Sequence, residues 1–419
     1  MQGVVVVHDA GNGKDGSTNP ARPAPPPSAT ARPLPAKLLR PSLLYAVLAT
    51  ASLAAVLLLL GAGGPGGLAS PTIPRIDALS ASAPPASPRQ PRPCAGDDGV
   101  GLERWTRPPA STWHNMTDEE LLWAASWRPA VRRYPRRRVP KVAFMFLTRG
   151  PLPLAPLWEK FFAGAGSKDL YSVYVHSTPG YRPEFPPTSV FYRRQVPSQE
   201  ARWGESSMCD AERRLLANAL LDGGNERFVL VSESCVPLFG FAVVYHYLTR
   251  SRHSFVGAFD DPSPHGRGRY RPALAPAVLP HQWRKGAQWF DLRRALAVDV
   301  VADGRYYPAF REHCRPPCYA DEHYLPTVLS IEAPHRIANR SVTWVDWSRG
   351  GAHPATFGAA DVDEAFLRRL TTAEQRLGAG RPCTYNGQPA EVCFLFARKF
   401  APSALQPLLD LAPKLLGYG

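Results

Sequence analysis

From about residue 139 onward, short apolar runs alternate with segments whose apolar residues recur at helical spacing. Runs rich in Val, Phe and Tyr predict strands, whereas apolar spacings of three and four residues predict helices. The predicted strands cover residues 142–147, 171–176, 189–193, 228–232 and 255–259, and the predicted helices cover 208–221 and 241–248. Because strands alternate with helices, we expect an α/β sheet domain.

Ligands of an α/β sheet bind beside the carboxyl ends of its strands. Polar segments follow three of the predicted strands, at residues 148–150, 177–180 and 232–234. The first contains Arg149 and the last contains Glu233. We therefore expect Arg149 and Glu233 to lie at the edge of a substrate site.

The N-terminal third has a different texture. Residues 1–42 are polar and Pro-rich and predict a disordered cytosolic tail, and residues 43–60 form an uncharged apolar run. At 1.5 Å per residue this run just spans a hydrocarbon core of roughly 30 Å. Lys37 and Arg40 precede it, which places the remainder of the chain in the lumen. A cleaved signal peptide is the alternative, but the run is longer and starts later than is usual for one.

A stalk and lead-in are predicted over residues 61–138, because the segment is rich in Gly, Pro, Ser and Ala. The domain itself is predicted over 139–419. Pro accounts for 46 of the 419 residues, and the formal net charge is +14. The densest basic run, at 132–141, is typical of a solvated face or linker, and a lumenal chain has no nucleic-acid partner to bind.

All seven cysteines follow the apolar run, which is typical of a disulfide-forming compartment. An odd number leaves at least one thiol without an intramolecular partner, and Cys94 in the stalk could link two chains into a homodimer. Cys314 and Cys318 are expected to be in disulfides, and their pairing stays open. A zinc site with His313 and His323 is the alternative, although its spacing is loose.

Two acidic residues, Asp321 and Glu322, follow this cysteine loop and open a helical pattern. They could simply stabilise the start of a helix, by capping it and by favouring its dipole. An acidic residue in that position can also serve as a general base. The residues alone leave both interpretations open.

Aromatic residues mark two further segments. Trp347 and His353 lie around a Gly pair in 344–354, and Trp289 lies in 283–290. Indole faces stack on sugar rings, although Trp is more often a core residue. We expect these three residues, with Asp321, to contact substrate. Near the C-terminus, a strand-like run at 393–400 carries two cations, Arg398 and Lys399. We expect them either to bind an anion or simply to be solvated at the end of a strand.

Five ordered stretches together resemble the plant branch of the core-2/I-branching β-1,6-N-acetylglucosaminyltransferase family. They are VAFMFLT at 142–148, WGE at 203–205, VSESCVPL at 231–238, ADEHY at 320–324 and ARKF at 397–400, within a resemblance that spans roughly 141–416. The resemblance implies a GT-A-type, Rossmann-like fold. It also implies an inverting glycosyltransferase that uses GlcNAc or another UDP-linked sugar and a glycan or glycoprotein acceptor. The implied location is the Golgi membrane, in type II orientation.

The resemblance also implies individual roles. Glu322 matches the family's catalytic base, Lys399 matches a cation that holds the donor diphosphate, and Arg381 is the second such cation. The animal enzymes of the family act without a metal ion, so we expect no cofactor beyond the UDP-sugar donor.

Two sites remain as metal alternatives. Asp361 and Asp363 form an Asp-x-Asp pattern that reads as the start of a helix, and Asp260 is followed by a second Asp after a predicted strand. Two N-glycosylation sequons begin at Asn115 and Asn339. A catalytically inactive lumenal protein that binds glycans or nucleotides is the alternative function.

Overall fold

The computed structural model describes residue 109 and residues 111–128, 134, 138–372 and 382–419. The predicted cytosolic tail (1–42), the predicted membrane anchor (43–60) and most of the predicted stalk lie outside these residues. Cys94 and Arg381 lie outside them as well. None of the described helices is both long and apolar enough to cross a membrane.

A four-stranded sheet with the order β2-β1-β3-β5 forms the core of the fold. Its strands are β1 (Lys141–Leu147), β2 (Tyr171–His176), β3 (Asn225–Ser232) and β5 (Asp291–Arg293). β1 pairs in parallel with β2 and β3, whereas β5 pairs antiparallel with β3. All residues of β1 after Lys141 are buried, as expected for a central strand that is covered on both faces. The predicted α/β class and the strands at 142–147, 171–176 and 228–232 are confirmed.

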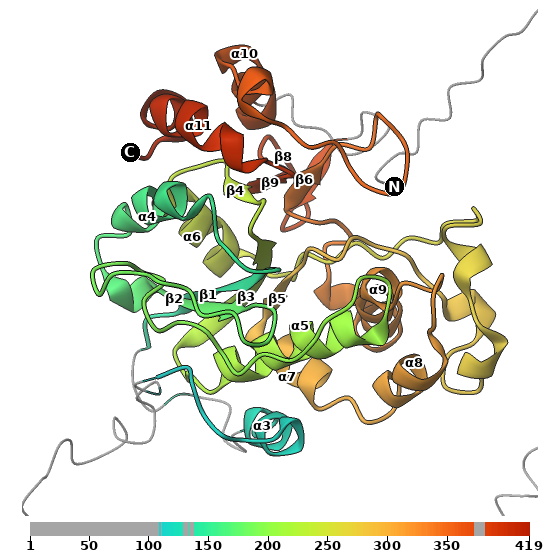
Figure 1. Ribbon diagram of the computed structural model, residues 1–419. Coiled ribbons are helices and arrows are strands. Elements are labelled where there is room, and N and C mark those ends of the chain that lie inside the picture. Colours follow the sequence, from blue (N-terminus) through green and yellow to red (C-terminus); the bar gives the residue numbers. More distant parts are fainter. Residues whose placement is uncertain (1–108, 110, 129–133, 135–137, 373–381) are drawn as a thin grey trace, which may run out of the picture. The chain divides into compact units, whose positions relative to one another are not determined.

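Helices cover both faces of this sheet (Figure 1). One face carries α5 (Ser206–Leu220) and α7 (Arg294–Val301), and the other carries α4 (Ala155–Ala163) and α6 (Phe241–Arg250). The helices predicted at 208–221 and 241–248 correspond to α5 and α6. A further helix, α3 (Asp118–Ala125), packs on α5, where Arg214 donates to Asp118. The last part of the predicted lead-in therefore packs against the domain.

A smaller sheet has the order β4-β9-β6. It consists of β4 (Val236–Pro237), β9 (Phe396–Arg398) and β6 (Thr343–Val345). β9 pairs antiparallel with β4 and parallel with β6, so the strand-like run at 393–400 becomes a short central strand. The other elements are α8 (Tyr307–His313), α9 (Ala320–Glu332), α10 (Glu364–Thr371), α11 (Leu405–Leu411) and a hairpin of β7 (Cys383–Tyr385) and β8 (Gln388–Ala390).

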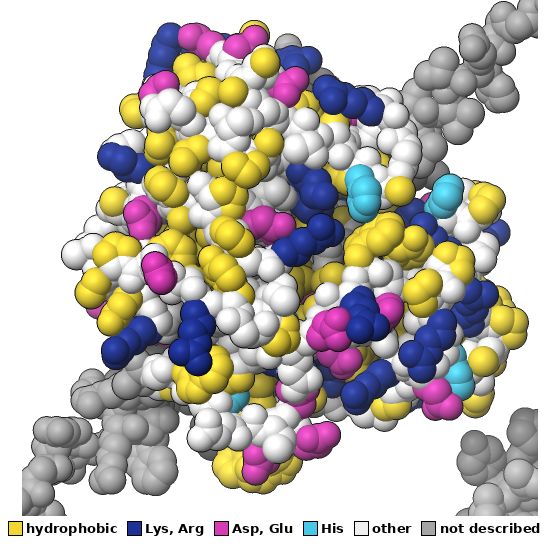
Figure 2. Space-filling model, in the orientation of Figure 1, with side chains coloured by type: hydrophobic (Ala, Val, Ile, Leu, Met, Phe, Trp, Pro, Cys, Tyr) yellow, Lys and Arg dark blue, Asp and Glu magenta, His cyan; other side chains and the backbone are white. Residues whose placement is uncertain are grey.

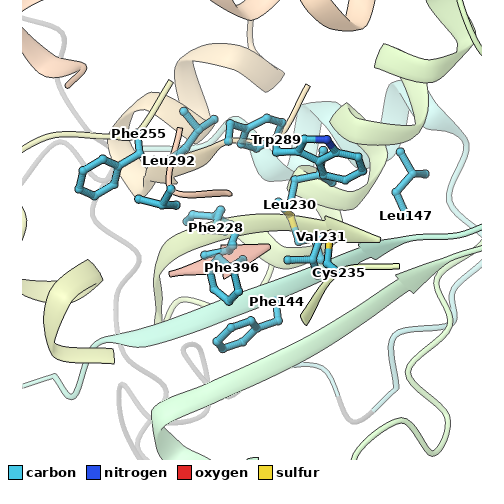
Figure 3. Packing of buried hydrophobic residues seen from close by; sticks show 14 of the residues in the cluster. Phe144, Leu147, Phe228, Leu230, Val231, Cys235, Phe255, Trp289, Leu292 and Phe396 are labelled. Atoms are coloured by element: carbon cyan, nitrogen blue, oxygen red, sulfur yellow. The ribbon is translucent and has the colours of Figure 1, made fainter. Parts of the chain in front are cut away.

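Aromatic side chains join the two sheets. Phe396 of β9 lies 6.4 Å from Phe144 of β1, between ring centroids, and stacks on Trp158 of α4 at 6.1 Å. Trp158 also donates a hydrogen bond of 3.0 Å to the carbonyl oxygen of Cys235. Figure 3 shows Phe144 and Phe396 next to each other, below Phe228 of β3. This junction fixes β9 against the main sheet.

Two strand predictions are wrong in whole or in part. Residues 189–193 form consecutive turns, in which the N–H of Tyr192 donates to the carbonyl oxygen of Ser189, and Arg193 has a φ of 52°. Residues 255–259 make only isolated bridges, at Phe255 and Phe259. Both segments are apolar because they supply aromatic side chains to the core, which does not require a continuous ladder.

Two disulfides lie in the described residues, Cys314–Cys318 and Cys383–Cys393. The zinc alternative is therefore wrong, because both of its cysteines are oxidised. Its fourth residue, His323, instead stacks on Trp283 with ring centroids 4.4 Å apart. The two remaining described cysteines are buried free thiols, at positions 209 and 235.

One fully buried ion pair ties β5 to β3. The Nε atom of Arg227 donates to Asp291 at 3.2 Å, and its Nη2 atom makes a second contact with the same carboxylate. Nη2 also donates to the carbonyl oxygen of His253, at 3.1 Å. A buried charge that loses its partner is strongly destabilising, because water cannot replace the lost contact.

We therefore expect Asp291→Ala to lower the free energy of unfolding by about 3–5 kcal/mol, since it leaves the guanidinium of Arg227 buried without its carboxylate. Urea unfolding of the purified domain measures this change. The matched control is Glu364→Ala, which removes exposed, solvent-screened pairs with Arg368 and Lys414 and should leave the free energy of unfolding nearly unchanged. Equal losses in the two variants would contradict the prediction.

Candidate active site

A cavity of about 2100 Å³ opens at the carboxyl ends of β1, β2 and β3. Figure 2 shows a hollow near the centre of the face in view, with Lys and Arg side chains beside it. Thr148 and Arg149 line it after β1, Ser177 and Thr178 after β2, and Glu233 after β3. The polar segments that follow these three strands therefore border one cavity.

Most of the predicted site residues gather in this cavity. It is lined by Arg149, Glu233, Trp289, Asp321, Glu322, Trp347, His353 and Lys399, and also by Asn339 of the second sequon. Arg381 lies outside the described residues, although the next residue, Pro382, lines the cavity. Asn115 lies away from the cavity, on the exposed segment before α3. Residues separated by 250 positions along the chain are thus brought to one place.

Glu322 enters the cavity from the first turn of α9. Tyr319 precedes the helix in the left-handed conformation, with a φ of 55°, and this sharp reversal starts the helix immediately after the Cys314–Cys318 loop. The carbonyl oxygen of Glu322 accepts a hydrogen bond of 2.9 Å from the N–H of Gly286, which anchors the turn to the cavity wall. A helix start held in this way keeps the carboxylate in one position.

The two oxygens of the Glu322 carboxylate have different surroundings. Oε2 accepts a hydrogen bond of 2.7 Å from Nη1 of Arg269 and lies 3.9 Å from Nζ of Lys285. Among the described residues, no hydrogen bond is made to Oε1. The side chain is 24% exposed. One oxygen is therefore held in place while the other is available to a ligand in the cavity.

Asp321, the preceding residue, lies in a different environment. It is only 5% exposed, and its Oδ1 atom has no hydrogen-bond partner among the described residues. Burial, together with the charge of Glu322, raises its pKa to about 7. Glu212 of α5 is also buried nearby, and burial and the charge of Asp321 raise its pKa. Asp321 is therefore an interior acid behind Glu322 and not a helix N-cap, a position that Tyr319 occupies.

Arg269 was not predicted from the sequence. It lies in a short turn (Arg267–Arg269) within a Gly-, Pro- and Arg-rich loop that has no helical or strand periodicity. Its guanidinium lies 4.2 Å from the ring centroid of Tyr319, so Tyr319 supports both the helix start and the partner of Glu322. No local pattern marks this role, because it depends on a contact between distant parts of the chain.

An aromatic wall continues from Tyr319 to the mouth of the cavity. The ring of Trp203 lies 4.9 Å from Tyr319 and 5.0 Å from His353, and it remains 47% exposed. The next residue, Gly204, has a φ of +83°, and a Cβ atom there would lie only 3.2 Å from the Tyr319 ring. The glycine therefore permits Trp203 to lie against Tyr319. Trp203 was noted in the sequence only as part of a motif.

Lys399 lies in a second charged region of the cavity. Burial lowers its pKa, and the cations Arg398 and Arg149 lower it further, whereas Glu233 opposes them. Like charges gathered in one partly buried place are costly unless an anion binds there. Lys399 and Arg149 therefore form a suitable anion site, with Glu233 as the acidic neighbour of Lys399.

Trp289 departs from the expectation of an open sugar platform. It is only 6% exposed, and the guanidinium of Arg398 lies over its ring, 4.0 Å from the centroid. Its role is therefore to support the cationic strand end. Trp347 is half-buried and His353 is exposed, so these two remain accessible to a ligand.

The two metal alternatives lie in different surroundings, and of the two only the one at Asp260 lines the cavity. Asp363 is the N-cap of α10, where its side chain accepts from the N–H of Phe366, as its sequence context indicates. Asp260 forms an exposed pair with Arg267. Across the described residues, no group of three or more His, Cys, Asp or Glu side chains is arranged to hold a metal ion.

The chain is similar to a known enzyme family and to a plant glycosyltransferase. The sequence model of the Core-2/I-Branching enzyme family matches residues 142–371. Glycosyltransferase BC10 of Oryza sativa subsp. japonica is 38% identical over 310 residues, which are 65% of this chain and 76% of that protein. The region matched by the family contains Arg149, Glu233 and Glu322, whereas Lys399 follows it.

The buried carboxyl of Asp321 predicts a pH dependence of stability. Its pKa rises from 3.8 to about 7 on folding, so the folded chain holds the proton more tightly than the unfolded chain does. The stability that this proton provides is fully present below pH 3.8 and is lost as the pH rises through 7. The native chain should therefore lose roughly 3–4 kcal/mol of unfolding free energy between pH 4 and pH 8. Asp321→Asn has no carboxyl at this position and should not show this loss. Urea unfolding of both proteins at the two pH values measures this difference, and a constant difference would contradict it.

Proposed function

The chain belongs to the core-2/I-branching enzyme family and is a glycosyltransferase, and from this premise we propose that it is an inverting enzyme using a UDP-linked sugar. It moves GlcNAc or another sugar from the UDP-sugar to a hydroxyl group of a glycan or glycoprotein, including a cell-wall glycan. Glu322 is the catalytic base, and the observation that carries this proposal is its carboxylate on the cavity wall, with Oε2 held by Arg269 and Oε1 without a hydrogen bond from any described residue.

Inversion requires one base and an in-line displacement. The acceptor oxygen attacks the anomeric carbon and forms the new glycosidic bond, while Oε1 of Glu322 takes the proton of the acceptor hydroxyl. The bond between the anomeric carbon and the diphosphate oxygen breaks, and UDP leaves with the electron pair. A carboxylate anchored through one oxygen can accept the proton at the other without moving, which is the geometry that general-base catalysis needs.

The leaving diphosphate develops negative charge, and positive groups that are already in place stabilise it. Lys399 and Arg149 line the cavity and supply this charge, which supports their assignment to the diphosphate. Arg381 is proposed as a further cation on the basis of the family resemblance alone. We propose that these cations take the place of a metal ion, so the reaction needs no cofactor.

The acceptor site is proposed at the aromatic end of the cavity. Trp203, Trp347 and His353 line it, and Trp203 contacts Tyr319 immediately before the helix that carries Glu322. An indole face binds the apolar face of a sugar ring, and a sugar bound here would lie beside the base. Asp321, the interior acid behind Glu322, positions the helix turn and is not proposed to touch substrate.

The location and the finer fold class are also part of the proposal. We assign the domain to the GT-A type, which the parallel strands and the site at their carboxyl ends support. The apolar run at 43–60 and the two disulfides support a type II protein of the Golgi membrane with a lumenal domain. Cys94 could link two such chains into a homodimer. A nucleic-acid partner is not proposed.

The first test follows UDP release by the secreted lumenal domain with a panel of UDP-sugars and glycan acceptors in the presence of EDTA. Glu322→Gln should lower turnover by roughly 100- to 10,000-fold, because the base is lost, while UDP still binds. Lys399→Met should lower kcat/KM by about 100-fold or more, because the leaving diphosphate loses a cation. The controls are Glu364→Gln and Lys414→Met, which change an exposed pair on α10 and should leave turnover intact.

Other outcomes would contradict separate parts of the proposal. Turnover that requires Mn²⁺ would overturn the metal-free mechanism and direct attention to Asp260 or Asp361. Full activity in Glu322→Gln would overturn the assignment of the base. Tight UDP binding without turnover on any acceptor would favour the alternative, an inactive lumenal protein that binds nucleotides or glycans.

A further inference from the structure

The segment that leads into α3 is fixed to the domain by alternate residues. Thr112 is buried, and its hydroxyl lies within hydrogen-bond distance of the carbonyl oxygens of Arg193 (3.1 Å) and Gln195 (2.9 Å). His114 shares a hydrogen bond of 2.9 Å with Asn218 of α5. The segment therefore has one side that binds the domain and one side that faces solvent.

The outward side carries a sequon together with an aromatic residue. Trp113, Asn115 and Thr117 are all exposed, whereas the residues between them are half-buried. Such alternation is typical of extended chain, in which residues two apart lie on the same side and roughly 7 Å from each other. The Trp113 side chain, 60% exposed, thus lies on the same side as Asn115 and within reach of a sugar attached to it.

Further apolar surface lies close by along the chain. Trp123 lies in α3 and Trp127 follows the helix, and their side chains are 64% and 65% exposed. The two rings pack edge to face, with centroids 4.8 Å apart. Figure 2 shows apolar side chains at the lower edge of the molecule, where Figure 1 places α3. Exposed apolar clusters on a soluble domain usually have an occupant. The sequon beside Trp113 supplies one from this chain itself.

The second sequon has the opposite surroundings. Asn339 lines the cavity, and its Oδ1 atom accepts a hydrogen bond of 2.7 Å from the N–H of Ala258. Arg340 and Ser341 are buried, and the Ser341 hydroxyl donates to the carbonyl oxygen of Trp289. A glycan on Asn339 would fill the cavity and disturb these contacts. Only the first sequon can carry a glycan in the folded protein without loss.

We propose that Asn115 carries an N-linked glycan whose first GlcNAc stacks on the exposed indole of Trp113. The co-reactant is an oligosaccharide linked to a lipid diphosphate. The amide nitrogen of Asn115 forms a bond to the anomeric carbon of the GlcNAc and loses one proton to a base. The bond from that carbon to the phosphate oxygen breaks, and the lipid diphosphate leaves with the electron pair. The apolar face of the sugar ring then covers the indole.

Thr117 serves two purposes in this arrangement. It completes the sequon, and its hydroxyl oxygen accepts from the N–H of Glu120 in a capping box that starts α3. A change at Thr117 would therefore confuse loss of the glycan with loss of the cap. Asn115→Gln removes the glycan and leaves the cap intact, so it is the variant to use.

The test uses the full chain produced in plant cells and purified from membranes, with glycopeptides measured by mass spectrometry. Asn115 should be occupied in most molecules and Asn339 in none. Thermal unfolding is then compared for the native chain, Trp113→Ala, Asn115→Gln and the double variant. Trp113→Ala should lower the midpoint by about 2 °C more when the glycan is present than when it is absent. Leu279→Ala, at an exposed apolar residue outside this segment, should cause equal shifts in both backgrounds.

Three results would overturn the proposal: an unmodified Asn115, a glycan on Asn339 in folded protein, or equal effects of Trp113→Ala with and without the glycan. The proposal rests on the lumenal location and not on the reaction. Protease protection of the domain in sealed membranes reports on that location, and the UDP-release assay reports on the reaction. A failure of the glycan site is therefore distinguishable from a failure of the proposed activity.

Discussion

The contact of Phe396 with Phe144 and Trp158 determines where the two charged regions of the cavity lie. Phe396 belongs to the small sheet and is followed two residues later by Arg398, whereas Phe144 is central in the parallel sheet. Burial of these rings holds β9 against the main sheet, and the N–H of Phe400 donates to the carbonyl oxygen of Ser234, so Lys399 lies close to Glu233. A cavity that draws on both sheets can thus be rigid, because its walls share one aromatic core.

The first turn of α9 places the adjacent carboxyl groups of Asp321 and Glu322 in different environments. Residues one apart on a helix face directions that differ by about 100°, so the two carboxyl groups point differently, and Asp321 is the more deeply buried of the two. Burial raises the pKa of Asp321 to about 7, so a large part of it is protonated at neutral pH. The negative charge behind Glu322 is thereby reduced, and the cations Arg269 and Lys285 contact its carboxylate directly.

Local patterns predicted the central strands, α5, α6 and the polar ends of the strands, because continuous apolar runs and helical periodicity have direct physical causes. The segment at 189–193 has the same residue types as a strand but turns, since its aromatic side chains reach the core from a loop. Glu322 and Lys399 were predicted through family resemblance, whereas Arg269 was not predicted at all. Its role comes from a contact 53 residues away in the chain, which no local pattern encodes.

The pairing of Glu322 with Arg269 also bears on how charge is balanced during the reaction. Before transfer, the cations near Oε2 offset the carboxylate. In the proposed reaction Glu322 takes the proton of the acceptor, so its negative charge disappears just as negative charge develops on the departing diphosphate. The net charge of the cavity therefore changes little along the reaction, although its position shifts from the base toward the leaving group. A fixed set of cations can serve both states without rearrangement, which is the condition under which preorganised electrostatics lowers a barrier most.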